Sequence, residues 1–303
     1  MSTPPDEHMA SAATDLKIAH LILTHKDPQQ LEKLINALDH PAFDFYIHVD
    51  KKSNINPFTY LADRKNVSFI KNRTKIYWAG YGTIQATING FREIFSGTYD
   101  YINVISSQDF PIKSAEYIYQ YLARQNGKEY ITCDSIDGEW NVASRVRKYH
   151  FINWRIPGKF RLEKIANKIL PSRQFPFDYE IVGRANWFTL TKKASQYIIN
   201  FLDKHPEMIR YFKYCWGADE FMFSTILYNS HFKDQIADNL VYVDWVGSTS
   251  GPGHPKILIS EDFESLKHSD KLFARKFDIK ADSTILDKLD DWINSDQFAN
   301  HAT

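Results

Sequence analysis

The feature that most constrains the fold of this chain is the alternation of apolar, strand-length runs with helix-period segments through its first half. Runs of strand length and composition occupy residues 17–24, 43–49, 67–71, 100–106 and 129–132. Apolar residues spaced three and four apart, as on one face of a helix, occupy residues 28–38, 84–95 and 114–125. This alternation predicts an α/β fold with a Rossmann-type, mostly parallel sheet flanked by helices.

The second half of the chain is less regular, but it has no low-complexity linker that would separate a second domain. We expect helices at 191–204, 205–213, 218–229 and 282–295, a helix opened by Ser260, and a strand at 240–245. Residues 1–16 are polar and are expected to form a disordered tail. The sequence therefore predicts one domain over residues 17–303, with a regular half at 17–135 and an irregular half at 136–303.

Composition excludes several functional classes. The chain has 37 Lys and Arg against 37 Asp and Glu, so it lacks the positive charge typical of a nucleic-acid-binding protein, and we expect no nucleic-acid partner. Two cysteines are too few for a disulfide scaffold and favour a reducing, cytoplasmic location. There is no uninterrupted apolar run long enough to span a membrane.

One segment departs from this neutral average. Residues 145–173 contain one acid, Glu163, and nine basic residues, namely Arg145, Arg147, Lys148, Arg155, Lys159, Arg161, Lys164, Lys168 and Arg173. Apolar residues such as Trp154, Phe160 and Ile165 lie among them. The segment is either a solvated surface excursion or a patch for an anionic membrane or another anionic partner, which would give the protein a peripheral position at the inner face of the membrane.

Two pairs of charged residues could carry chemistry. Asp219 and Glu220 open an apolar helical segment. They are either an ordinary helix cap and its dipole partner, or a cap at Asp219 beside a general base at Glu220. Arg275 and Lys276 lie between phenylalanines with strand-like alternation, so their side chains should point to opposite faces, one structural and one free to meet an anion.

Other motifs are weaker. Residues 247–256 form a Gly- and Ser-rich loop that ends at Lys256 and could cradle a phosphate, although it does not match a P-loop. No G-x-G-x-x-G motif is present, and the histidines lack the spacing of metal ligands. In a parallel sheet, ligands bind beyond the carboxyl ends of the strands, where this chain carries Thr24, His25, Asp50 and residues 106–109.

These motifs together resemble glycosyltransferase family 14, the family of core-2/I-branching N-acetylglucosaminyltransferases and peptide O-xylosyltransferases. The segments that carry the resemblance occur in the family's order across residues 17–278. They are AHLILTHKDPQQLEKLINAL, FYIHVDKKS, YWAGYGTIQATI, NVISSQDFPIKS, GRANWFTLTKKASQYI, ADEFMFSTIL and LFARKFD.

The resemblance implies a GT-A-like fold and an inverting transfer of a sugar from a UDP-sugar to a hydroxyl group, without a metal or other cofactor. In agreement, the chain has no Asp-x-Asp motif. The resemblance places the general base at Glu220. It assigns the diphosphate to Arg275 and Lys276, and Lys256 is a further candidate.

The resemblance also divides the site between the two halves of the chain. Residues 17–135 would form the nucleotide-sugar-binding half and residues 136–303 the acceptor and catalytic half. The remaining donor residues would be Thr24, His25, Asp50, Trp78 and Asp109, and the acceptor and sugar residues would be Gln108, Asn186, Trp187 and Asp219.

The chain also departs from the family pattern. Asn186 stands where the xylosyltransferases use an acid, which argues against the acceptor chemistry of a xylosyltransferase. GlcNAc is the favoured sugar, followed by xylose, glucose or galactose. The anchor, stem and cysteines of animal members are not found, so we expect a bacterial-type member with a glycan or lipid-linked acceptor. Three alternatives remain: a UDP-xylose-dependent xylosyltransferase, a non-catalytic nucleotide-sugar or glycan-binding module, and a glycoside hydrolase, which would need a second carboxylate facing Glu220.

Overall fold

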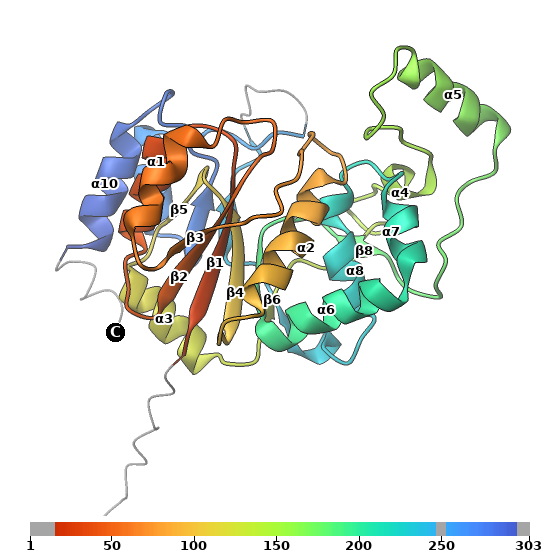
Figure 1. Cartoon of the computed structure of the whole chain (residues 1–303). Coiled ribbons are helices and arrows are strands. Elements are labelled where there is room, and N and C mark those ends of the chain that lie inside the picture. The colour runs from red at the N-terminus through yellow and green to blue at the C-terminus, as the bar shows by residue number, and fades with distance from the viewer. Residues whose placement is uncertain (1–15, 247–252, 296–303) are drawn as a thin grey trace, which may run out of the picture.

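A seven-stranded sheet forms the centre of the computed structural model, which describes residues 16–246 and 253–295 (Figure 1). Its strand order is β10-β6-β9-β4-β1-β2-β3. The strands are β1 (Ile18–Thr24), β2 (Phe43–Val49), β3 (Val67–Phe69), β4 (Tyr101–Ser106), β6 (Glu129–Tyr130), β9 (Phe188–Thr191) and β10 (Ile236–Ala237). β1 runs parallel to β2 and β4, and only β9 is antiparallel to its neighbours. The predicted α/β fold with a mostly parallel sheet is confirmed.

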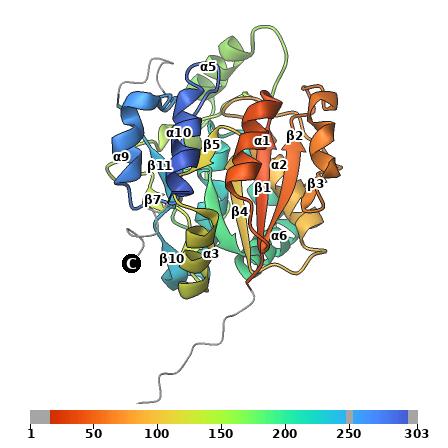
Figure 2. The same ribbon diagram turned by 90° about the vertical axis from the view of Figure 1, so that its left-hand side faces the viewer.

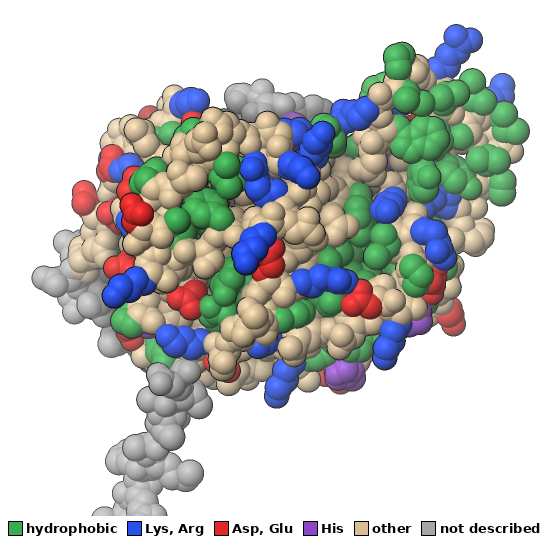
Figure 3. Space-filling model, in the orientation of Figure 1, with side chains coloured by type: hydrophobic (Ala, Val, Ile, Leu, Met, Phe, Trp, Pro, Cys, Tyr) green, Lys and Arg blue, Asp and Glu red, His purple; other side chains and the backbone are tan. Residues whose placement is uncertain are grey.

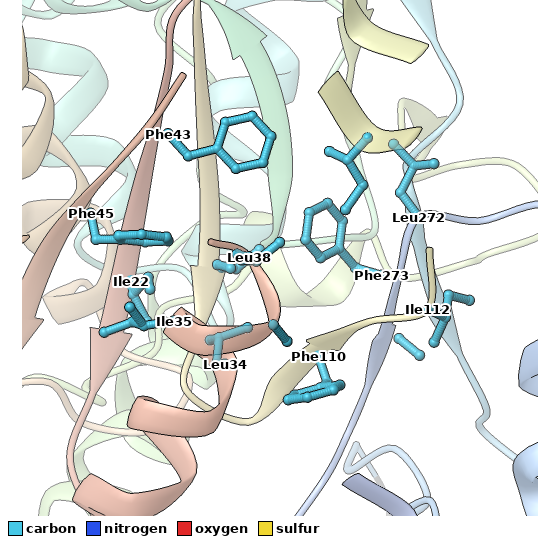
Figure 4. Packing of buried hydrophobic residues seen from close by; sticks show 14 of the residues in the cluster. Ile22, Leu34, Ile35, Leu38, Phe43, Phe45, Phe110, Ile112, Leu272 and Phe273 are labelled. Atoms are coloured by element: carbon cyan, nitrogen blue, oxygen red, sulfur yellow. The ribbon is translucent and has the colours of Figure 1, made fainter. Parts of the chain in front are cut away.

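Helices cover both faces of this sheet (Figures 1 and 2). One face packs against α1 (Pro28–Ala37), α3 (Ala115–Arg124) and α10 (Thr284–Ile293), and the other against α2 (Gly82–Ile94), α6 (Lys192–Lys204) and α8 (Met222–Tyr228). β1 supplies both cores, because Ile18 and Ile22 face one layer while Ala19, Leu21 and Leu23 face the other. Figure 4 shows the first of these cores, in which Leu34 and Ile35 of α1 lie beside Ile22 and Phe45.

Two smaller sheets stand beside the central one. β5 (Asp109–Pro111), β11 (Val241–Val243) and β12 (Phe273–Arg275) form a sheet of order β11-β12-β5, and β7 (Asp134–Ser135) pairs with β8 (Val182–Gly183). The register of β12 on β5 places Arg275 opposite Asp109. The smaller sheet thereby carries a basic residue from near the end of the chain to the carboxyl end of β4.

The remaining helical elements lie in the connections. The α-helices are α4 (Ser144–Arg147), α5 (Lys159–Ile169), α7 (Pro206–Phe212) and α9 (Phe263–Lys267). The 3₁₀ turns are η1 (Asn56–Asp63), η2 (Ala218–Glu220), η3 (Lys233–Gln235) and η4 (Ser260–Asp262). None of the helices that the structure describes has the length and apolar character required to cross a bilayer.

The structure differs from the sequence-based assignment in several places. The strands β9 and β10 at one side of the central sheet were not expected, and residue 191, the expected start of a helix, ends β9. The helix expected over 218–229 is split, because Phe221 (φ −120°, ψ −45°) separates the turn η2 from α8. Leu16, which was assigned to the disordered tail, is buried in the core, while residues 1–15 of that tail lie outside the described residues.

Candidate active site

A cavity of about 870 Å³ opens beyond the carboxyl ends of β1, β2 and β4. Segments from the second half of the chain complete its walls, including residues 184–187, 216–220 and 238–245. Most of the predicted site residues line it, namely Thr24, His25, Asp50, Trp78, Gln108, Asn186, Trp187, Asp219, Glu220, Arg275 and Lys276. Asp109 and Lys256 do not line it. The structure thus brings residues from both halves of the chain to one cavity.

The strand ends form a polar floor. Thr24 Oγ1 donates a hydrogen bond to Ser107 Oγ at 2.8 Å, which joins the ends of β1 and β4. Asp50 is buried at the end of β2, where its carboxylate accepts the backbone N–H of Lys52 at 2.9 Å. Burial lowers the pKa of His25, so this imidazole favours the neutral form. The floor offers hydrogen-bonding groups suited to a polar ligand.

An aromatic wall stands beside this floor. The indole of Trp78 is 56% exposed and lies edge-on to Trp216, with ring centroids 5.0 Å apart. His254 stacks on the same indole, also at 5.0 Å. Large aromatic faces at a cavity mouth are surfaces on which a sugar ring or a base can pack.

Glu220 projects into the cavity from the turn η2. Its Oε2 lies 2.9 Å from Nη2 of Arg145, and its side chain is 26% exposed. The guanidinium of Arg145 in turn lies over the rings of Trp216 and Phe221, 4.3 and 5.0 Å from their centroids. Burial raises the pKa of Glu220, while the ion pair with Arg145 opposes that rise. The arrangement holds a carboxylate with elevated basicity in a defined orientation.

Two glycines allow the backbone to place Glu220 there. Gly217 has φ 65°, and a Cβ on it would lie 2.2 Å from Nη2 of Arg145. Gly183 of β8 passes so close to η2 that a Cβ would lie 1.9 Å from the carbonyl oxygen of Glu220. The neighbouring Arg184 N–H donates to that same oxygen at 3.0 Å. β8 therefore supports the turn that carries the carboxylate.

Asp219 does not cap a helix, contrary to the sequence-based interpretation. Gly217 occupies the N-cap position of η2, and the Asp219 carboxylate instead accepts a hydrogen bond from the side-chain amide of Asn186 at 3.2 Å. Burial is the main cause of a raised pKa at Asp219. Because Asn186 and Asp219 come from different segments, this contact fixes the wall around Glu220.

Arg275 and Lys276 line the same cavity, so the expectation that they point to opposite faces is wrong. β12 ends at Arg275, and strand alternation therefore does not extend to Lys276. Arg275 Nε lies 3.5 Å from the fully buried Asp109 carboxylate, which sits behind the cavity as an anchor. Lys276 differs, because its ammonium has no ion pair or hydrogen bond within the described part of the chain. It is the cation available to a bound anion.

Lys256 is engaged elsewhere. Its ammonium lies 2.6 Å from Asp262 and 3.9 Å from Asp244, which accounts for its position outside the cavity lining. A phosphate-binding role for Lys256 would require these contacts to break. The remainder of the proposed phosphate cradle, residues 247–252, lies outside the described residues.

Sequence reasoning missed Arg145 as a site residue. It belongs to the basic segment 145–173, which the structure divides. Arg145 faces Glu220, Arg173 is buried with its guanidinium on the carbonyl oxygens of Val146 and Tyr211, and Arg147 pairs with Asp137. The excess of positive charge was a signal that the segment is unusual, but charge alone does not show which cations turn inward. Trp216, which also lines the cavity, was likewise missed.

Comparison with known proteins agrees with the motif analysis. A family model described as Core-2/I-Branching enzyme matches residues 18–267. Xylosyltransferase 2 of Rattus norvegicus is 24% identical, over 91% of this chain and 33% of that protein. Xylosyltransferase 1 of Canis lupus familiaris is also 24% identical, over 92% of this chain and 31% of that protein. The chain thus spans about a third of the length of these curated relatives.

Solved structures give more distant matches. The apo form of mouse Xyloside xylosyltransferase 1 is 10% identical with a TM-score of 0.36, over 86% of this chain and 96% of that one. The glycosyltransferase GlyE of Streptococcus pneumoniae TIGR4 is 12% identical with a TM-score of 0.34, over 74% of this chain and 45% of that one.

Proposed function

This chain belongs to the core-2/I-branching enzyme family, and from that membership we propose that it is an inverting glycosyltransferase that uses a UDP-sugar. The observation that carries the proposal is one cavity that contains a half-buried carboxylate, Glu220, and an ammonium without a partner among the described residues, Lys276. A single displacement at a sugar requires one base and one stabilised leaving group. These two side chains supply both.

In the proposed reaction, Glu220 takes the proton of an acceptor hydroxyl, and the hydroxyl oxygen forms a bond to the anomeric carbon. The bond between that carbon and the diphosphate oxygen breaks, and its electron pair leaves with UDP. Lys276 meets the negative charge that grows on the diphosphate, with Arg275 held beside it by Asp109. Arg145 orients the Glu220 carboxylate.

We propose GlcNAc as the first candidate for the transferred sugar and a glycan or lipid-linked hydroxyl as the acceptor. Xylose is the second candidate, because the relatives compared above are named xylosyltransferases. GlcNAc ranks first because the family model that matches this chain is that of the core-2/I-branching enzymes.

A panel of UDP-GlcNAc, UDP-xylose, UDP-glucose and UDP-galactose tests this proposal. We expect one donor to raise the melting temperature and to release UDP, slowly into water and faster when simple alkyl glycosides are added. Stabilisation by UDP without release from any donor would show a binding module. Cleavage of a glycoside in the absence of nucleotide would show a glycoside hydrolase.

We also propose that transfer needs no divalent metal. The sequence has no Asp-x-Asp motif, and across residues 16–246 and 253–295 no three His, Cys, Asp or Glu side chains gather as a metal site requires. Activity should therefore persist in excess EDTA and change little when Mn²⁺ or Mg²⁺ is added. Loss of UDP release in EDTA, restored by Mn²⁺, would contradict metal independence while leaving the glycosyltransferase assignment intact.

A further inference from the structure

Helix α5 is attached to the protein by its polar side. The Glu163 carboxylate accepts the backbone N–H of Phe151 at 2.8 Å. The Asn167 side chain exchanges two hydrogen bonds with the backbone of Tyr149, each 2.7 Å. No residue of α5 is buried. An ordinary amphipathic surface helix buries its apolar side, whereas α5 turns its polar side toward the protein and its apolar side toward solvent.

The outward side of α5 carries two adjacent stripes. Leu162, Ile165 and Ile169 are exposed at positions three and four apart, and Ile169 is 73% exposed. Arg161, Lys164 and Lys168 repeat the same spacing one residue earlier and are also exposed. Figure 3 shows hydrophobic side chains gathered over this helix with basic ones at its edge.

The apolar exposure continues on both sides of the helix. Trp154, Ile156 and Leu170 flank α5 and are exposed, as is Phe160 (62%) in its first turn. Trp154 stacks on Phe151 with ring centroids 4.3 Å apart, so its position is fixed relative to the body of the protein. We call residues 154–170 the α5 surface. Such a contiguous apolar area on a folded chain marks a site of association.

We propose that the α5 surface binds the anionic leaflet of a lipid membrane. The charge of the α5 surface favours an anionic membrane over a second copy of this surface, which would bring like charges together. Residues 154–170 contain five basic residues and a single acid, Glu163, which is turned toward the protein. An interfacial helix places apolar side chains among acyl chains and its cations among lipid phosphates at the same time. The apolar stripe of α5 would meet the acyl chains, and its basic stripe would meet the lipid phosphates.

The position of α5 relative to the cavity adds to this inference. The helix projects at the end of the molecule toward which the carboxyl ends of β1 and β4 point (Figure 1). Residues at these strand ends line the cavity, so the cavity lies toward the same end. Membrane binding through the α5 surface would hold the cavity close to the bilayer. The membrane proposal requires no turnover, so it stands or fails independently of the glycosyltransferase assignment.

Sedimentation with vesicles tests the proposal on the full chain. We expect binding to vesicles of equal parts phosphatidylcholine and phosphatidylglycerol, weakened by salt, and little binding to pure phosphatidylcholine. Each cation near such a surface strengthens binding about fivefold, so Lys164→Gln with Lys168→Gln should weaken it about 25-fold. Ile165→Ser with Ile169→Ser should weaken binding to the anionic vesicles as well, because it removes the apolar side chains that enter the acyl region. These positions are exposed, so the melting temperature should not change.

Lys193→Gln with Lys204→Gln is the matched control. Both lysines are exposed on α6 and lie outside the α5 surface, so their loss removes the same charge from another helix. If the control weakens vesicle binding as strongly as the α5 pair, the attraction is general and the proposal is wrong. Equal binding to neutral and anionic vesicles would also overturn it. The proposal would also be wrong if the protein does not bind vesicles. If the protein is then a dimer that Ile165→Ser with Ile169→Ser dissociates, the α5 surface joins two copies of the chain.

Discussion

Glu220→Gln should lower the rate of UDP-sugar turnover by about 10²- to 10⁴-fold, the typical loss when a general base is removed. Glutamine keeps the shape of the side chain and an oxygen for Arg145, but it cannot take a proton at neutral pH. UDP affinity and melting temperature should therefore remain close to those of the parent. Steady-state UDP release, calorimetry with UDP and a thermal melt measure the three quantities.

The pH profile gives this prediction a second readout. A base must be ionised to act, and burial raises the pKa of Glu220. Activity in the parent should therefore decline as the pH falls through a value above that of an ordinary glutamate, and this decline should be absent from the residual activity of Glu220→Gln. Glu180→Gln is the matched control, because Glu180 is exposed and lies outside the cavity lining. A variant with near-normal turnover, or one that does not fold, would show that Glu220 is a structural residue.

Lys276→Ala should lower kcat/KM by about 10- to 200-fold, the loss expected when one charge-assisted hydrogen bond to the transition state is removed. The diphosphate gains negative charge as the glycosidic bond breaks, so a cation directed at it stabilises the transition state more than the bound donor. Lys276 has no partner of its own among the described residues, so its removal leaves no buried carboxylate unpaired. UDP-release kinetics with the preferred donor measure the effect.

Ligand binding separates a diphosphate clamp from a general loss of structure. UDP should bind Lys276→Ala more weakly than the parent, while uridine, which has no phosphate, should bind equally well. Lys280→Ala serves as the control, because Lys280 is highly exposed and pairs with Asp27 outside the cavity lining. An equal loss of uridine and UDP affinity, or no loss of either, would exclude the clamp. Arg275→Ala is less informative, since it would leave the Asp109 carboxylate buried without its cation.

The sequence determined β1 to β4, the parallel part of the central sheet, and the edge at which the site lies, but it did not reveal the short strands β9 and β10. A strand covered by helices on both faces is buried along its whole length and mostly apolar, as β1 is. An amphipathic helix repeats its apolar residues with a fixed period, as α1 does. Both signals are local and can be read from neighbouring residues. Parallel strands then place Thr24, Asp50 and residues 106–108 at one edge without any knowledge of the rest of the chain.

Only the tertiary structure decided the partners of the charged side chains. Arg145 and Glu220 are far apart in the chain, as are Asp109 and Arg275. A charged residue has the same local signature whether it turns outward, as Lys164 does, or inward, as Arg145 does. The direction of the side chain depends on which distant segment packs beside it. A charged group turns inward only where that segment supplies a partner, because burial of an unpaired charge is strongly unfavourable. The sequence therefore predicted most of the charged and polar side chains of this site. Packing between distant segments determined which of these side chains are paired within the protein and which are available to a ligand.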